Sequence, residues 1–228
     1  MFIGTIGACS DIGVLALAEG CRQLKVLGIC DPSSNSDISD LSIIKITESC
    51  TLLENLTLSC LRQVTDESCF AIERNCKHLK LLELYELSGI ESEVGLKTLF
   101  SSPNLKGLTR VDVENIPVFT DDVLLELVKN LHGTLTSLGL GGYDSMDVTD
   151  AGMYHISQYC RKLEEFTITY LHYISLPTYI AEIIRCNPRL VTFSFHSDIG
   201  ENRIKKKDTL APMIEDALEK NIKLMKGK

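Results

Sequence analysis

Cysteine and histidine are the side chains in this sequence that could support nucleophilic catalysis. The chain contains nine cysteines and five histidines, and Cys76 lies two residues from His78. A thiol becomes a nucleophile when it is exposed and when a neighbouring imidazole lowers its pKa. Cys76, however, belongs to a series of cysteines that recur at regular intervals, which indicates a packing role. We therefore predict no catalytic residue and expect that the protein is not an enzyme.

The spacing of ligand-type residues indicates neither a metal site nor a cofactor site. There is no Cys-x-x-Cys pair, and Cys50 and Cys60 are too far apart for the closely spaced ligands of a structural zinc site. The glycine-rich stretch 139–142 lacks the Lys-Ser/Thr of a phosphate-binding loop and the full spacing of a dinucleotide loop. We expect the protein to hold no metal and no cofactor.

The charge and the hydropathy of the chain restrict its partners. The formal net charge of -8 disfavours binding to nucleic acid or to an anionic membrane, and it favours a basic partner or plain solubility. The sequence has no apolar run long enough to cross a bilayer, and its start lacks the basic and apolar regions of a signal peptide. The odd number of cysteines argues against a secreted disulfide framework. We expect a cytoplasmic or nuclear protein.

A short leucine pattern, Leu-x-x-Leu-x-Leu with Ile, Val or Phe in the later places, organises the whole chain. Its seven copies begin about 26 to 29 residues apart, which matches a repeat array. The alternating Leu-x-Leu part predicts a short strand with one buried face. The copies are Leu24-Leu27-Ile29, Leu53-Leu56-Leu58, Leu79-Leu82-Leu84, Leu108-Val111-Val113, Leu135-Leu138-Leu140, Leu163-Phe166-Ile168 and Leu190-Phe193-Phe195.

A helix is predicted ahead of each strand, and both of its ends are marked. A hydroxyl residue followed by Asp precedes five of the apolar stretches, where the two side chains can cap the free amides of the first turn and complement the helix dipole. Cysteine stands three residues before the first leucine in four copies. The starts are Ser10-Asp11, Ser39-Asp40, Thr65-Asp66, Thr120-Asp121 and Thr149-Asp150, and the cysteines are Cys21, Cys50, Cys76 and Cys160.

These segments resemble the cysteine-containing leucine-rich repeats of F-box proteins. Residues 64–68 with 75–79 carry the resemblance, as do residues 149–153 with 159–163, and it extends over about residues 9 to 196. The resemblance implies an α/β fold: a right-handed leucine-rich-repeat solenoid, or horseshoe, with a parallel β-sheet on the concave face and helices on the convex face. It also implies a role in binding another protein.

The departures from the repeat predict the domain organisation. Residues 1–199 are expected to form the repeat domain, with an incomplete repeat at Phe2–Ile6 that suggests a fragment of a longer protein. Residues 200–228 are expected to form a basic loop and a capping helix over 208–226, where apolar residues recur at helical spacing. The fourth copy lacks both Thr-Asp and cysteine and carries Ser101-Ser102-Pro103, which predicts a longer loop.

Residues that flank the buried strand positions should point into the concavity, because side chains alternate along a strand. Most of the charged ones are acidic, so we predict a strip that binds a basic segment of a protein partner, with Tyr85 as an anchor. Ser137 and Gly139 should leave a shallow spot. The alternative is that these are ordinary solvated strand positions. The predicted partner-binding residues are Glu83, Tyr85, Arg110, Asp112, Glu114, Glu165 and Thr167.

Two functions follow from the resemblance. The first is the substrate-recognition part of an SCF-type ubiquitin ligase, acting in ubiquitin-dependent protein degradation. An F-box needs about forty residues ahead of the repeats, whereas here the first repeat begins at Ser10, so ligase components are expected only if a longer form carries an F-box. The alternative is a stand-alone scaffold or inhibitor that binds a partner without ligase recruitment. A GTPase-activating role would need a catalytic arginine, and none of Arg62, Arg110 and Arg203 lies in a distinguishing motif.

Overall fold

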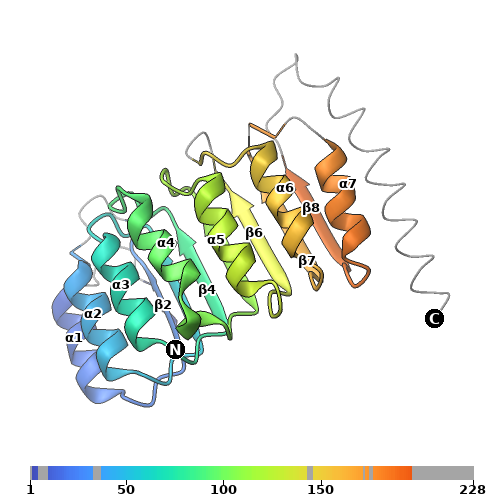
Figure 1. Cartoon of the computed structure of the whole chain (residues 1–228). Helices are drawn as coiled ribbons and strands as arrows, with labels where there is room; N and C mark the ends of the chain where they lie inside the picture. The colour runs from blue at the N-terminus through green and yellow to red at the C-terminus, as the bar shows by residue number, and fades with distance from the viewer. Residues whose placement is uncertain are drawn as a thin grey trace.

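The structure is a computed structural model that describes residues 2–4, 10–32, 37–142, 146–171, 173–174 and 177–196. Within these ranges the strands form one parallel sheet in sequence order, and the helices lie in a single layer on one of its faces (Figure 1). No helix in the described ranges is long and apolar enough to cross a membrane. The strands are β1 Phe2–Gly4, β2 Val26–Cys30, β3 Asn55–Ser59, β4 Leu81–Tyr85, β5 Arg110–Glu114, β6 Ser137–Gly141, β7 Glu165–Thr169 and β8 Thr192–His196.

The leucine pattern sets the register of the sheet. Each strand pairs with the next so that equivalent repeat positions lie side by side, for example Leu56 with Leu82 and Leu58 with Leu84. The second and fourth residues of β3, β4, β5 and β7 are buried, whereas the first, third and fifth are half-buried. The predicted alternation is therefore confirmed. The fold is a right-handed leucine-rich-repeat solenoid with its strands on the concave face and its helices on the convex face.

The helices begin where the hydroxyl residues predict. Ser39, Thr65 and Thr149 each accept a hydrogen bond from the backbone amide two residues later, and Thr120 accepts from Val123. Ser10 precedes its helix but makes no side-chain cap bond, so the expectation of a cap there is wrong. The helices are α1 Asp11–Gly20, α2 Asp40–Ser49, α3 Asp66–Asn75, α4 Glu93–Ser101, α5 Asp121–Leu131, α6 Asp150–Tyr159 and α7 Pro177–Cys186.

The aspartates that begin α1, α2, α3 and α5 also connect neighbouring repeats, which the sequence did not reveal. The Asp40 carboxylate accepts hydrogen bonds from the Thr65 amide (2.9 Å), the Thr65 hydroxyl (2.7 Å) and the Ser68 hydroxyl. Asp11 accepts the same three bonds from Ser39 and Ser42 of the next repeat. We call these contacts between repeats the aspartate ladder, and its carboxylates are Asp11, Asp40, Asp66 and Asp121.

The cysteines before the strands are at the helix ends. Cys50, Cys76 and Cys160 are buried C-cap residues whose amides bond to the carbonyl four residues earlier. The small thiol fits the crowded turn from helix to strand, and the Cys50 thiol donates to the Cys21 carbonyl at 3.3 Å. Cys21 itself is exposed, because α1 has no described helix packed on its outer side. The packing role therefore holds for the inner repeats and not for Cys21.

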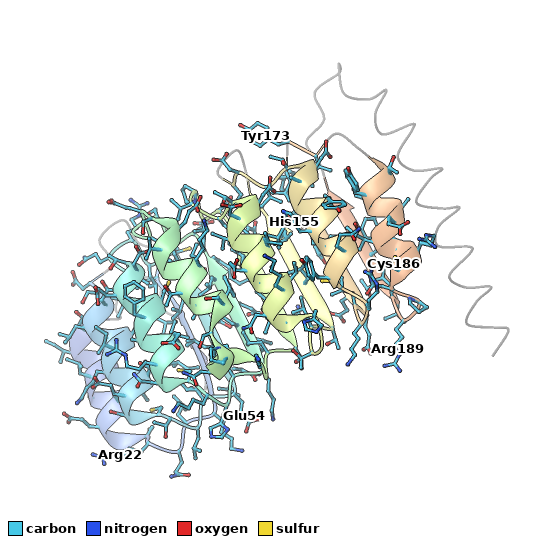
Figure 2. The ribbon with its side chains drawn as sticks, in the orientation of Figure 1. Arg22, Glu54, His155, Tyr173, Cys186 and Arg189 are labelled. Atoms are coloured by element: carbon cyan, nitrogen blue, oxygen red, sulfur yellow. The ribbon has the colours of Figure 1, made fainter. Side chains whose placement is uncertain are left out.

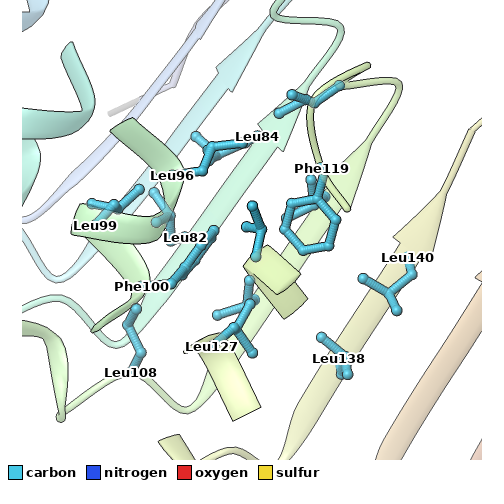
Figure 3. Close-up of a cluster of buried hydrophobic side chains, with 14 of the residues drawn as sticks. Leu82, Leu84, Leu96, Leu99, Phe100, Leu108, Phe119, Leu127, Leu138 and Leu140 are labelled. Atoms are coloured by element: carbon cyan, nitrogen blue, oxygen red, sulfur yellow. The ribbon is translucent and has the colours of Figure 1, made fainter. Parts of the chain in front are cut away.

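The fourth repeat keeps the helix start in altered form. This repeat lacks Thr-Asp, as expected, but Ser92 caps α4 and Glu93 takes the place of the aspartate. The segment after α4 forms a 3-10 helix at Pro103–Leu105, in place of an irregular loop, and Leu105 is buried. The core at this point includes Phe100 and Phe119, whose rings lie edge to face with their centroids 6.0 Å apart (Figure 3).

The ends of the chain are described only in part. Strand β1 pairs with β2 in parallel, and the last two residues of the expected strand, 5 and 6, lie outside the described residues. The expected basic loop and capping helix over 200–228 lie outside the described residues, as does the proposed domain boundary at residue 199.

Candidate concave binding site

Three rows of side chains line the concave wall, because the first, third and fifth residues of each strand face away from the helices. The strand register places equivalent residues next to one another across the sheet. The first row is Val26, Asn55, Leu81, Arg110, Ser137, Glu165 and Thr192; the middle row is Gly28, Thr57, Glu83, Asp112, Gly139, Thr167 and Ser194; the last row is Cys30, Ser59, Tyr85, Glu114, Gly141 and Thr169.

Arg110 connects carboxylates from two other strands. Its Nη1 donates to Glu165 Oε2 at 3.0 Å, and its Nε lies 3.7 Å from Glu83 Oε1. The reach from β5 to β7 passes the short side chain of Ser137 on β6, whose hydroxyl also donates to Glu165 at 3.0 Å. Thr57 donates to Glu83 at 2.8 Å. Five strands are thus joined by one polar network, and Glu83 and Glu165 are both neutralised in part.

Tyr85 and Asp112 form a second pair beside that network. The Tyr85 hydroxyl lies beside the Asp112 carboxylate and favours its ionised form. Asp112 lies over Gly139 of the next strand, where an added Cβ would come within 2.3 Å of Asp112 Oδ1. The absence of a side chain at Gly139 therefore makes room for Asp112. The shallow spot predicted at Gly139 is wrong, because the Asp112 carboxylate fills it.

Burial and like charges shift the ionisation of these acids. Burial, together with the charges of Glu83 and Glu114, raises the pKa of Asp112 to about 6, although Tyr85 and Arg110 act in the opposite direction. The pKa of Glu114 is raised by burial and by Glu86. Within the described part of the chain, neither Asp112 nor Glu114 forms an ion pair with a basic side chain. Two acids on the wall thus carry charge that no cation of the wall balances directly.

Glu54, in contrast, is a carboxylate that is paired with two lysines. It lies at the edge of the sheet where the strands begin (lower edge in Figure 2), 2.7 Å from Lys25 and 2.5 Å from Lys80. Hydrogen bonds and charge from the two lysines lower the pKa of Glu54 to about 2. The pKa of Asp112 is shifted in the opposite direction, because its surroundings are buried and mostly acidic.

The structure brings most of the predicted partner-binding residues together. Glu83, Arg110 and Glu165 belong to one network, and Tyr85 and Asp112 to the adjoining pair. Thr167 lies in the middle row of the wall, beside Gly139. Sequence reasoning missed Thr57, although its equivalence to Glu83 in the repeat alignment could have revealed it. That these residues bind a partner remains a prediction.

The buried thiols at two of the helix ends, Cys76 and Cys160, are not activated as nucleophiles. Burial raises the pKa of both Cys76 and Cys160 to about 12, so both stay protonated near neutral pH. His78 is exposed, whereas Cys76 points into the core. Among the described residues, no three of the His, Cys, Asp and Glu side chains are grouped as metal ligands would be.

Sequence comparison finds one short likeness. The chain is 32% identical over 75 residues to the F-box protein SKIP1 of Arabidopsis thaliana, a match that covers 33% of this chain and 24% of that protein. The chain therefore spans about a quarter of the length of this relative. No protein-family model matches the sequence.

Similar arrangements occur among solved structures at low identity. The yeast complex of Rad7 and Elc1 contains a chain that is 17% identical, with a TM-score of 0.44, over 83% of this chain and 65% of that one. The actin-binding site 2 of leiomodin-1 is 16% identical, with a TM-score of 0.28, over 96% and 99% of the two chains. The tropomodulin C-terminal domain of Caenorhabditis elegans is 15% identical, with a TM-score of 0.34, over 96% of each. With TM-scores below 0.5, none of these likenesses bears on function.

Proposed function

We propose that this protein is a protein-binding module whose concave wall holds an extended, basic segment of a partner protein. The observation that carries the proposal is the surplus of carboxylates at the centre of the wall. Among the described residues of the wall, the four acids Glu83, Glu165, Asp112 and Glu114 accompany one basic side chain, Arg110. A lysine or arginine from a partner would supply the missing charge for Asp112 and Glu114, and the ring of Tyr85 offers an adjoining aromatic surface.

The proposal extends to the ubiquitin pathway. The chain would act as the substrate-recognition part of an assembly similar to an SCF-type ubiquitin ligase, in ubiquitin-dependent protein degradation. What supports this step is the 32% identity to an F-box protein over 75 residues. Ligase components would join through an F-box in a longer form of the protein, while the repeats hold the substrate.

Peptide selection tests the binding surface. A library of random 12-residue peptides displayed on phage is selected against the full chain and against the double variant Asp112→Asn, Glu114→Gln. We expect lysine and arginine to be enriched by the natural chain and not by the variant. The matched control is Glu19→Gln, Glu48→Gln, which removes two exposed charges from helices α1 and α2. Enrichment of the same basic peptides by all three proteins would contradict the proposal.

Co-purification tests the pathway. The natural full-length protein is precipitated from its own cells, and the precipitate is probed for a cullin and for its adaptor, with residues 1–228 expressed alone as the comparison. We expect both components with the full-length protein. Their absence, together with intact binding of basic peptides, would indicate a stand-alone scaffold or inhibitor instead.

A further inference from the structure

Arg110 carries more hydrogen-bond donors than its neighbours use. A guanidinium has five N–H groups, yet in the described structure the side chain donates one hydrogen bond, from Nη1 to Glu165. Its Nε is buried and has no hydrogen-bond acceptor among the residues that the structure describes. The 3.7 Å from Nε to Glu83 Oε1 is an ion-pair distance and exceeds that of a hydrogen bond.

The side chain is nevertheless accessible from the concavity. Arg110 is 41% exposed and Glu165 is 45% exposed, whereas Glu83 is only 19% exposed. A group that lies over the guanidinium can therefore reach both Arg110 and Glu165. The charge at this point is close to -1, from one arginine and two carboxylates, so an incoming carboxylate would be repelled.

An amide group fits this position better than a charged group does. The carbonyl oxygen of Asn or Gln accepts from the unused Arg110 donors, and its NH2 donates to Glu165. An aliphatic group would leave the donors unpaired, which is costly for a group held away from water. A second cation would be attracted by the carboxylates but would compete with Arg110 for them.

The cation position lies two residues farther along the same strand. Asp112 follows Arg110 in β5 with one residue between them, so their side chains share a face about 6.7 Å apart. An extended peptide repeats its side chains on one face at the same interval. One face of such a peptide can therefore place a lysine or arginine at Asp112 while it places an amide at Arg110.

We propose that the concave wall recognises an extended protein segment in which a basic residue and an Asn or Gln are separated by one residue. The inference rests on the proposed function, since it specifies the partner of that same wall. The basic side chain binds at Asp112 and Glu114, and the amide binds at Arg110 and Glu165. A nucleic acid does not fit, because its phosphates would meet Asp112 and Glu114.

Designed peptides test the inference. Four fluorescein-labelled 12-residue peptides with Gly-Ser flanks carry Lys-Ser-Gln, Lys-Ser-Leu, Lys-Ser-Glu or Lys-Ser-Lys at the centre, and each is also made with the tripeptide reversed because the direction of the bound segment is open. Fluorescence anisotropy at pH 7.5 gives the Kd of each for the full chain. In one direction, we expect Lys-Ser-Gln to bind about fivefold more tightly than the other three.

The variant Arg110→Met should reverse the expected order of the peptide affinities. Without the arginine, Glu83 and Glu165 lose their cation, so Lys-Ser-Lys should become the tightest peptide and the advantage of Lys-Ser-Gln should disappear. Thermal unfolding shows whether the variant is folded, and the ranking on the natural chain tests the inference even if it is not. Tightest binding of Lys-Ser-Lys to the natural chain would overturn the inference and leave the proposed function standing. Failure of every peptide to bind would overturn both.

Discussion

Two groups of carboxylates in this protein have opposite surroundings. On the aspartate ladder, Asp40 accepts hydrogen bonds from one amide and two hydroxyls of the next repeat. On the concave wall, Asp112 has the Tyr85 hydroxyl, a buried position and two acidic neighbours. A carboxylate whose acceptor sites are filled by its own chain stabilises the fold. One that is left with surplus charge is available to a partner, so the number of internal partners distinguishes the two roles.

Removal of a ladder carboxylate should give the largest loss of stability. Asp40→Ala leaves the amide of Thr65 and the hydroxyls of Thr65 and Ser68 without their acceptor. At about 1 kcal/mol for each lost bond, the free energy of unfolding should fall by about 3 kcal/mol. Urea unfolding measures this change, with Asp112→Asn on the wall as the comparison. A loss for Asp112→Asn as large as that for Asp40→Ala would remove the distinction between the two groups.

The ladder should be weakest at Asp66. This carboxylate accepts from the Ser92 hydroxyl through Oδ2, whereas its buried Oδ1 has no partner in the described structure. Gly95 stands where Ser42 and Ser68 supply a hydroxyl in the repeats before it, and it packs directly against Asp66. Asp66→Ala should therefore cost only about 1 kcal/mol in urea unfolding. An equal loss at Asp66 and Asp40 would show that the number of bonds does not set the effect.

As the pH falls, the ladder carboxylates and the acids of the concave wall should change the free energy of unfolding in opposite directions. Burial raises the pKa of Asp11, but hydrogen bonds from Ser39 and Ser42 outweigh burial, so the pKa is lowered on balance. Its contribution to stability is present above the unfolded pKa and is lost as the pH falls through the folded one. Asp112, with a folded pKa of about 6, binds its proton more tightly when folded, so acidification from pH 7 to pH 4 favours folding through this group.

Urea unfolding between pH 4 and pH 7 measures that difference. Compared with the natural chain, Asp112→Asn should lose about 1 kcal/mol of the stabilisation gained on acidification, since solvent reaches the group in part. Asp11→Asn should instead lose some of the destabilisation that acidification causes through Asp11. Peptide binding should weaken below pH 6 as Asp112 is protonated, and it should not do so in Asp112→Asn. Identical pH profiles for the two variants would contradict the comparison.

Substitution of Gly139 on the concave wall should have the smallest effect on stability. In Gly139→Ala the new methyl group displaces the Asp112 carboxylate toward water, and the far end of that side chain can move at little cost. We expect a change within about 0.5 kcal/mol in the free energy of unfolding. The pKa of Asp112, followed by carboxyl-carbon NMR, should fall toward its ordinary value. An unchanged pKa would show that Gly139 does not shape the site.

The strands, their register and most helix starts could be predicted because each depends on local sequence that recurs. Leu56, Leu82 and Val111 align in the sheet as they align in the repeats. The start at Ser92 was missed because Glu93 replaces the usual aspartate.

The wall was predictable as a set of outward positions but not as a network. Whether Arg110 reaches Glu165 depends on the short side chain of Ser137 between them, and whether Asp112 is buried depends on Gly139 beside it. These contacts are between residues on different strands, so they cannot be predicted from the sequence of a single repeat.

The incomplete contact at Asp66 has a consequence for how the molecule comes apart. In a stacked chain of coils, cooperativity passes only between neighbours, and each interface sets the free energy at which the two sides separate. Among the interfaces joined by a ladder aspartate, that between α3 and α4 has the fewest hydrogen bonds to the carboxylate, one against three between α2 and α3, so opening at a ladder interface should begin there. Amide hydrogen exchange would then follow two protection levels, one before residue 92 and one after it.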